Sequence, residues 1–360
     1  MRHPFSILFV LVWMLACGPR EKTPRSIEVV SLGGATTIDE KTKLSEWGLF
    51  EGDLKLLRPA EGILPYDLNT PLFSDYAYKA RFVKIPAGVP ASYHASEVME
   101  FPVGTMLIKN FYYPTDFRKP KAERRILETR LLIHEAVAWK ALTYVWNDEQ
   151  TEAFLEIAGA SVPVEWTDAN GKLQRISYSV PNQNQCKSCH ELNGKLVPIG
   201  PTARQLNHDH EYADGPHNQI RKWAELGLLT DIDAEDSWPT LAKWDDPATG
   251  TLDDRARAWL EINCAHCHRK EGPAKNTGLH LLVATTNDYE LGVNKPPVAA
   301  GRGSAGLKFG IVPGKPEQSI LMHRIKSLDP GEMMPEVGRK MQHQEGIALV
   351  EEWIREMESI

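Results

Sequence analysis

The sequence has no excess of positive charge, which limits the partners of the protein. Its 41 Lys and Arg residues are outnumbered by 48 Asp and Glu residues, and the formal net charge is −7 at pH 7. It has no basic stripe of the kind that binds a phosphate backbone, so we predict no nucleic-acid partner. It also lacks a phosphate-binding loop, a catalytic triad and a carboxylate pair that would specify a substrate.

Long apolar runs are missing as well, except at the N-terminus. The chain begins MRHPFSILFVLVWMLACGPREK, with one apolar run over residues 7–15. That run is shorter than the roughly 18 residues of a spanning helix and is typical of a secretory signal. Residues 14–17 also resemble a bacterial lipobox. We therefore predict a lipoprotein signal peptide over residues 1–17 and lipidation of Cys17, with ordinary signal cleavage as the alternative.

The residues after Cys17 indicate where the predicted lipoprotein resides. Gly18 rather than Asp follows the cysteine, which in the lipoprotein pattern favours the outer membrane over retention at the inner membrane. Residues 18–30 predict a charged tether between the lipid anchor and the folded chain. The sequence thus predicts a bacterial outer-membrane lipoprotein that faces the periplasm or the cell surface.

Cysteine is scarce, and the few that are present follow a pattern. Of the five cysteines, one is Cys17 and the other four form two Cys-x-x-Cys pairs. An exported protein meets an oxidising compartment, where free thiols are not expected. A histidine directly follows each pair. The first motif consists of Cys186, Cys189 and His190, and the second motif consists of Cys264, Cys267 and His268.

Disulfides, a shared zinc ion and covalent haem compete to explain these motifs. A zinc ribbon places its pairs within about 15 to 20 residues, whereas 75 positions separate Cys189 from Cys264. Neither pair lies in a thioredoxin-like βαβ unit, which disfavours a redox pair. A c-type haem needs two cysteines for thioether bonds and the adjacent histidine as iron ligand. The chance count of this motif is on the order of 0.002, so two copies predict two covalent haem c groups, with iron bound by His190 and His268.

The second motif lies near the end of a predicted helix. Thr251 and Asp254 form a capping signature, and the helix places one face on Ala256, Leu260, Asn263, Cys264 and Cys267. Further along, Met333 and Met334 precede Pro335 in a predicted loop, from which a thioether sulfur could reach iron. A closing helix is predicted by an apolar stripe of Ile347, Val350, Ile354 and Met357.

These features resemble a small class I cytochrome c domain that runs from about residue 252 to the C-terminus. In such domains the methionine before proline is commonly the sixth iron ligand, and the resemblance carries this role over to Met334. Met333 and Met341 are the alternatives. The resemblance implies a cytochrome c-like domain over residues 246–360.

A longer pattern resembles a family of exported bacterial dihaem cytochrome-like lipoproteins. It spans roughly residue 68 to the C-terminus, in the segments YDLNTPLFSDYAYKARFVKIPAG, EFPVGTMLIKNF, RILETRLLI, TYVWNDEQTEAF, NQCKSCH, IGPTARQLN and NQIRKWAELGLL. This resemblance implies the architecture and the cofactor, and it implies no reaction.

The N-terminal half is predicted to form antiparallel β structure. Short segments rich in β-branched and aromatic residues recur there, and Asn170-Gly171 is a type I′ turn signal for a hairpin. These segments cover residues 81–85, 106–112, 125–133, 142–146 and 152–157. The predicted fold class is α+β and multidomain: a β-rich domain over 31–180, a first haem-binding segment over 181–245, and a mainly α-helical haem domain over 246–360.

The haem of the first motif has no obvious sixth ligand in the sequence. Methionine is absent between Cys189 and Met322, so no local Met-Pro loop follows the motif. Histidines of the next loop or residues of the β-rich domain are candidates, and an open position is equally compatible. The candidates are His208, His210, His217, Met99, Met106 and His134. We interpret Lys109 as a surface residue.

Electron transfer is the function that we predict from these features. Two haems in one chain would pass electrons to or from a periplasmic or membrane redox partner. A dihaem peroxidase-like enzyme with an open first haem is the alternative. Such enzymes place their first haem near the mature N-terminus, whereas about 170 residues of the predicted mature chain precede Cys186 here. A binding or scaffold protein that carries haem is the third class.

Overall fold

The computed structural model describes residues 39–298 and 300–358. The predicted signal peptide over 1–17, the lipidated Cys17 and the tether over 18–30 lie outside these residues. None of the helices in the described part of the chain combines the length and apolarity that crossing a bilayer requires.

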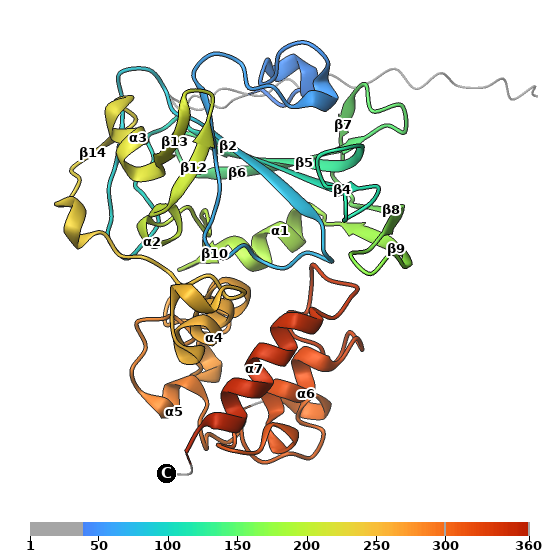
Figure 1. Ribbon diagram of the computed structural model, residues 1–360, viewed down its shortest axis with the longest axis vertical. Coiled ribbons are helices and arrows are strands. Elements are labelled where there is room, and N and C mark those ends of the chain that lie inside the picture. Colours follow the sequence, from blue (N-terminus) through green and yellow to red (C-terminus); the bar gives the residue numbers. More distant parts are fainter. Residues whose placement is uncertain (1–38, 299, 359–360) are drawn as a thin grey trace, which may run out of the picture. The chain divides into compact units, whose positions relative to one another are not determined.

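A six-stranded antiparallel sheet organises the first half of the chain (Figure 1). Its strand order is β1-β2-β4-β5-β6-β7. The strands are β1 (Ile63–Tyr66), β2 (Tyr78–Lys84), β4 (Met106–Pro114), β5 (Arg124–His134), β6 (Trp139–Trp146) and β7 (Ala153–Leu155). All five predicted strand segments coincide with strands of this sheet. Both faces of its central strands pack against apolar clusters, which explains why these strands read as nearly continuous apolar runs.

The predicted hairpin is present, but its turn differs from the prediction. Strands β8 (Ala160–Thr167) and β9 (Leu173–Val180) pair antiparallel. A type I′ turn needs positive φ at two central residues. Gly171 has a φ of 79°, whereas Asn170 is not among the residues with positive φ. The Asp168 carboxylate instead accepts from the backbone N–H groups of Asn170 and Lys172, so the loop is longer than a two-residue turn.

Short elements dominate the segment over residues 181–245. Five strands and three helices occur there: α1 (Gln183–His190), β10 (Glu191–Leu192), β11 (Lys195–Leu196), α2 (Ala203–Leu206), β12 (Asp209–Tyr212), β13 (Gly215–Asn218), α3 (Gln219–Glu225) and β14 (Leu229–Thr230). Strand β14 pairs in parallel with β3 (Ala91–Ser92), which ties this segment to the first half of the chain. Trp223 of α3 and Leu206 of α2 join one apolar core with residues of β2 and β4.

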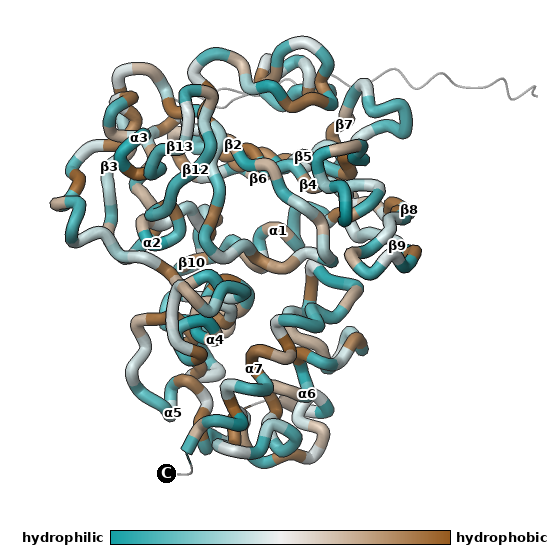
Figure 2. Tube along the Cα trace, in the orientation of Figure 1, coloured by the Kyte–Doolittle hydropathy of each residue, from teal (hydrophilic) through white to brown (hydrophobic). Residues whose placement is uncertain are grey.

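The last third of the chain carries α4 (Leu252–Leu260), α5 (Asp288–Leu291), α6 (Ile320–Lys326) and α7 (Gln344–Glu356). The predicted cap is confirmed, because the Thr251 hydroxyl accepts from the Asp254 N–H and the Asp254 carboxylate accepts from the Thr251 N–H. The predicted stripe of α7 is confirmed for Ile347, Val350 and Ile354, which are buried, whereas Met357 lies directly after the helix and is partly buried. In Figure 2 the chain alternates between hydrophobic and hydrophilic colours along α7.

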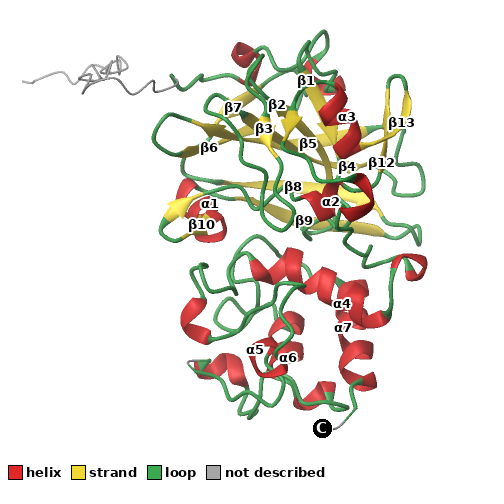
Figure 3. Cartoon of the chain, turned by 90° about the vertical axis from the view of Figure 1, so that its left-hand side faces the viewer, coloured by secondary structure: helices red, strands yellow, loops and turns green. Residues whose placement is uncertain are grey.

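The predicted fold class is wrong. The described residues belong to one compact unit, Thr36–Ile360, and strand (27%) outweighs helix (25%). The seven α-helices of the described residues run from 4 to 13 residues, and Figure 3 shows long loops between α4 and α7. Prolines and glycines punctuate these loops and stop helices from extending. The chain is therefore β-rich, without the mainly α-helical haem domain that we predicted, and the boundaries at residues 181 and 246 stay predictions.

A buried carboxylate joins the sheet side of the fold to the segment that precedes α7. Asp75 is 2% exposed, and its carboxylate accepts hydrogen bonds of 2.8 Å from the backbone N–H groups of Lys340 and Met341. The Tyr113 hydroxyl of β4 donates to the carbonyl oxygen of Asp75. Burial raises the pKa of the Asp75 carboxyl, and the two N–H donors offset part of that rise.

Replacement of Asp75 by alanine should destabilise the protein by about 3 kcal/mol. The change leaves two buried N–H groups without an acceptor and places alanine at a φ of 52°, and each of these effects costs about 1 to 3 kcal/mol. Asp75→Asn keeps one acceptor oxygen and a residue that tolerates positive φ, so it should cost less than about 1 kcal/mol. Urea unfolding of both variants measures the difference, and equal losses would show that the carboxamide cannot replace these contacts.

Candidate cofactor-binding site

The first motif ends a short capped helix. Asn182 accepts from the Gln185 N–H, and the Gln185 side chain accepts from the Asn182 N–H, so α1 starts three residues before Cys186. Residues three apart lie on neighbouring turns of one helix face, so Cys186 and Cys189 are presented together. His190 follows as the last residue of α1.

His190 is held so that one ring nitrogen stays available. Its Nδ1 lies 2.8 Å from the carbonyl oxygen of Val197, and the Val197 N–H donates to the carbonyl of His190. Because a carbonyl only accepts, Nδ1 must carry the proton and Nε2 must carry the lone pair. Burial lowers the pKa of His190 to about 4, so the imidazole is neutral at neutral pH. Iron-binding histidines in proteins have this arrangement.

The second motif follows α4 through a π-helical turn, Glu261–Ala265. Nδ1 of His268 lies 3.2 Å from the hydroxyl oxygen of Thr277. That hydroxyl donates to the carbonyl of Ala274 over 2.7 Å, so it accepts from the imidazole, and Nε2 again carries the lone pair. Burial lowers the pKa of His268 to about 4. The two motifs therefore hold their histidines in the same tautomer through different oxygen acceptors.

The two motifs lie next to each other in the fold. The thiols of Cys189 and Cys267 lie close enough to influence each other, which lowers the pKa of Cys189 and raises the pKa of Cys267. The Cys267 thiol also donates to the carbonyl of Ser188 at 3.6 Å. The 75 positions that separate the pairs in sequence therefore do not separate them in space.

The donor sets of the motifs fit haem better than the other cofactors. Within residues 39–298 and 300–358, no group of three or more His, Cys, Asp or Glu side chains is arranged to hold a metal ion. A shared zinc site needs such a group. A c-type haem needs instead two thiols and one neutral imidazole at each motif, and both motifs supply them.

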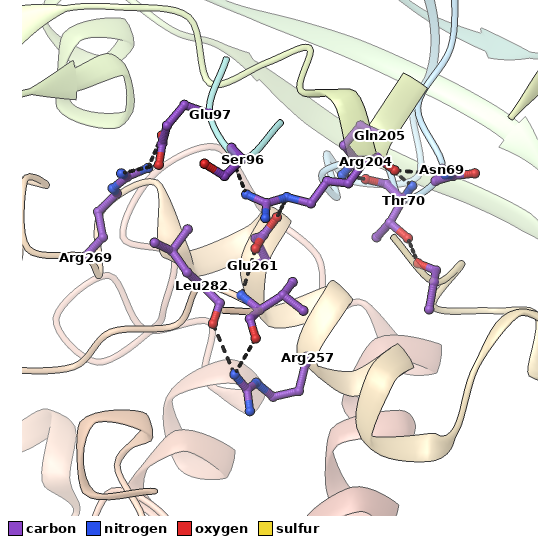
Figure 4. A network of polar contacts seen from close by, with 12 residues as sticks. Asn69, Thr70, Ser96, Glu97, Arg204, Gln205, Arg257, Glu261, Arg269 and Leu282 are labelled. Atoms are coloured by element: carbon purple, nitrogen blue, oxygen red, sulfur yellow. Dashed lines mark hydrogen bonds and ion pairs between the residues drawn. The ribbon is translucent and has the colours of Figure 1, made fainter. Parts of the chain in front are cut away.

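A network of buried polar contacts connects the loops of the first half to the helix of the second motif (Figure 4). Arg204 of α2 lies 2.9 Å from the Glu261 carboxylate and donates to the carbonyl of Ser96. Glu261 also accepts from the Val283 N–H, while Arg269 pairs with Glu97 at 3.1 Å. Glu261 is 9% exposed. Buried charges that are satisfied in this way restrict the orientation of the segments that carry them.

One cavity, which we call the central cavity, adjoins the first motif. Its lining includes Cys186, Cys189 and His190, whereas Cys264, Cys267 and His268 lie outside the lining. The sheet contributes side chains of β2, β4, β5 and β6, and the last third of the chain contributes Trp259, Ile262, Asn263, His266, Ile325, Met334, Pro335, Val337, Gly338, Arg339, His343 and Ile347.

Met334 lines the central cavity from a loop that is held by its backbone. The Met334 N–H donates to the carbonyl of Arg324, and the Arg339 guanidinium donates to the carbonyls of Met334, Ser327 and Arg324. These arginines lie near the second motif as well. Burial raises the pKa of Cys264 to about 12, and Arg339 offsets part of that rise. Arg324 contributes to the lowered pKa of His268. The loop thus adjoins both motifs, whereas Met333 is 8% exposed and lies outside the cavity lining.

The residues that we predicted as sixth ligands of the first haem lie elsewhere. None of His208, His210, His217, Met99, Met106 and His134 lines the central cavity. His208 lies beside Gln219, His210 pairs with His217 across the β12–β13 hairpin, and His134 stacks on Trp139. Met99 and Met106 belong to apolar cores.

Sequence reasoning missed His266, which lies between the cysteines of the second motif. His266 lines the central cavity, its Nδ1 is buried without a hydrogen-bond partner, and its imidazole helps to lower the pKa of the Cys189 thiol. His343, which also lines the cavity, is engaged, because its Nδ1 accepts from the Trp259 indole at 2.9 Å. The letters CAHCH carry a signal for His268 alone, so only the proximity of the two motifs identifies His266.

Lys109 is a second residue whose position differs from the interpretation of the sequence. It was interpreted as a surface residue, but its side chain lines the central cavity together with Arg81 and Arg130.

Comparison with known proteins does not assign the chain to a family, because no family model, curated protein or solved structure matches it. The function must therefore be argued from the site.

Proposed function

We propose that this protein is a c-type cytochrome with two covalent haem groups that transfers electrons to or from a redox partner. The observation that carries the proposal is that both Cys-x-x-Cys-His motifs hold a neutral imidazole whose Nδ1 is engaged and whose Nε2 keeps its lone pair. Cys186 and Cys189 would bind one haem and Cys264 and Cys267 the other, with His190 and His268 as iron ligands. Bound haem supplies iron that cycles between Fe(II) and Fe(III).

The chain's own residues suit electron transfer through adjacent centres. The proximity of Cys189 and Cys267 brings the two attachment points together, so two bound groups would begin from neighbouring thiols. The apolar lining and the network of Arg204 and Glu261 keep the site rigid, and a rigid site needs little rearrangement when charge changes. The resemblance to exported bacterial dihaem lipoproteins agrees with two covalent haem groups. A lipid on Cys17 would hold the protein at the outer membrane, facing a periplasmic or membrane partner.

The peroxidase alternative requires an open position on the first haem. His266 argues against it, because a buried imidazole with a free nitrogen lines the cavity that His190 also lines. We propose His266 as the sixth ligand of the first haem and Met334 as the sixth ligand of the second. Thioether ligation favours Fe(II) and would raise the potential of the second haem above that of a bis-histidine haem.

Protein matured in a host that attaches haem should contain about two haems per chain. A pyridine haemochrome assay measures this number. Replacement of Cys186 and Cys189 by alanine should reduce it to about one, as should replacement of Cys264 and Cys267. A wild-type value near zero, or zinc in elemental analysis, would contradict the proposal.

The reduced wild-type protein should not bind carbon monoxide, because His266 would occupy the sixth position of the first haem. His266→Ala should allow carbon monoxide to shift the absorption of one haem of the two. His343→Ala is the matched control, since this histidine lines the same cavity with its Nδ1 engaged, and it should leave the protein unreactive. Carbon monoxide binding by the wild type, with steady peroxide consumption from a reduced cytochrome, would favour the peroxidase alternative.

Met334→Ala should abolish the weak sulfur-to-iron absorption band of an oxidised haem with histidine and methionine ligands. Met333→Ala should retain the band, because the resemblance to class I cytochrome c domains assigns the ligand role to the methionine directly before proline, which is Met334. The band should also persist when Cys186 and Cys189 are replaced, since it belongs to the second haem. Loss of the band in that last variant would assign Met334 to the first haem.

A further inference from the structure

Three cationic residues stand side by side across the central sheet. Arg81 of β2 pairs directly with Lys109 of β4, and Lys109 pairs with Arg130 of β5. Thr143 of β6 continues the same row as the partner of Arg130. Residues directly opposite each other point to the same face of a sheet, so the three charges share one face. Like charges in this position destabilise a sheet, and the row therefore requires a compensating charge.

The protein itself compensates only the two ends of the row. Arg81 pairs with Asp67 at 2.8 Å, and Arg130 donates to the Glu128 carboxylate at 2.9 Å. Among the described residues, no carboxylate lies within 4.0 Å of the Lys109 Nζ, whose recorded contact is the Phe111 ring at 4.8 Å. In addition, Arg81 Nη2 is buried without a hydrogen-bond partner. The Lys109 amine and one Arg81 donor thus remain without a polar partner at the centre of the fold, and burial together with the neighbouring cations lowers the pKa of Lys109 well below its ordinary value.

The row lies along the wall of the central cavity, beside the first motif. Arg81, Lys109, Arg130 and Thr143 all line the cavity. The side chain of Thr143 is hydrogen-bonded to the Cys186 thiol. Three strand spacings of about 4.8 Å place Arg81 roughly 14 Å from Thr143. An anion in this cavity would therefore meet Lys109 and Arg81 at a distance from the attachment cysteine.

We propose that Arg81, Lys109 and Arg130 form a carboxylate-binding site, occupied by the propionates of the haem on Cys186 and Cys189. The inference rests on the proposed function, because it assumes that this haem is attached. A haem c is bound through its vinyl side chains, and its two propionates are the anionic groups of the macrocycle. The end of the row next to Cys186 is the uncharged Thr143. Lys109 and Arg81, which have unpartnered nitrogen atoms, lie further along the sheet, where the propionate carboxylates would be needed. A free small carboxylate is the other source of the same chemistry.

Lys109→Met tests the site, because methionine is unbranched and uncharged. The positive charge of Lys109 favours Fe(II), so its removal should shift the reduction equilibrium of the first haem about tenfold toward Fe(III), which is 59 mV for one electron. The second haem should be unaffected. The control is Lys187→Met, which removes an exposed lysine of α1 whose charge is screened by solvent; the shift there should be less than twofold. An equally small shift in Lys109→Met would overturn the proposal.

Thermal unfolding separates a ligand site from a structural role of Lys109. In the full chain with Cys186 and Cys189 replaced by alanine, Lys109→Met should raise the melting temperature, because it removes a buried amine that has no polar partner. In the wild-type background with both haems attached, the same change should lower the melting temperature. A loss of stability in both backgrounds would show that Lys109 is structural and would overturn the proposal.

Sodium succinate distinguishes the two sources of carboxylate. When propionates fill the site, succinate should leave the absorption of the wild-type protein unchanged. Saturable perturbation in the wild type that Lys109→Met abolishes would assign the site to a free carboxylate and overturn the propionate assignment. A haem count near zero would refute the proposed function itself, whereas two haems with an unchanged potential would refute this inference alone.

Discussion

His190 donates its Nδ1–H to the carbonyl of Val197, and His268 donates to the Thr277 hydroxyl. Most of the site depends on these two bonds. A neutral imidazole can offer a lone pair only at the nitrogen that does not carry the proton, so the acceptor on Nδ1 decides which atom can bind iron. The β10–β11 pairing precedes Val197 directly, and the Thr277 hydroxyl is oriented by Ala274. The short elements around each motif thus set the chemistry of its histidine.

A few side chains likewise make most of the contacts described here between distant segments. Asp75 binds the backbone before α7, and Arg339 donates to the carbonyl of Met334 and to two carbonyls at the end of α6. Each contact satisfies buried polar groups that would otherwise cost stability. Because the groups are backbone atoms, the arrangement depends on the path of the chain more than on neighbouring side chains. The sheet, the first motif and the methionine loop are thereby held around one cavity.

Local pattern predicted the elements of this protein well and its architecture poorly. The strands over 106–112 and 125–133, the cap at Thr251 and the stripe of α7 follow from periodicity and hydrogen-bonding chemistry within a few residues. The prediction of a mainly α-helical last domain was wrong, because a helix at each end of a segment says little about the structure of the residues between them. The turn at Asn170-Gly171 was wrong in type, because the Asp168 carboxylate offers a competing set of hydrogen bonds.

The sequence alone determined the two Cys-x-x-Cys-His motifs and the prediction of haem attachment, because thioether and imidazole chemistry depend on spacing within five residues. Only the tertiary structure decided which residues surround them. It brought Cys189 to Cys267, excluded the six predicted sixth ligands from the central cavity, and placed His266 there instead. It also turned Lys109 from an ordinary strand residue into the unpaired member of a cationic row. Strand register and the packing of segments far apart in the chain make these contacts, and neither is written in any local stretch of sequence.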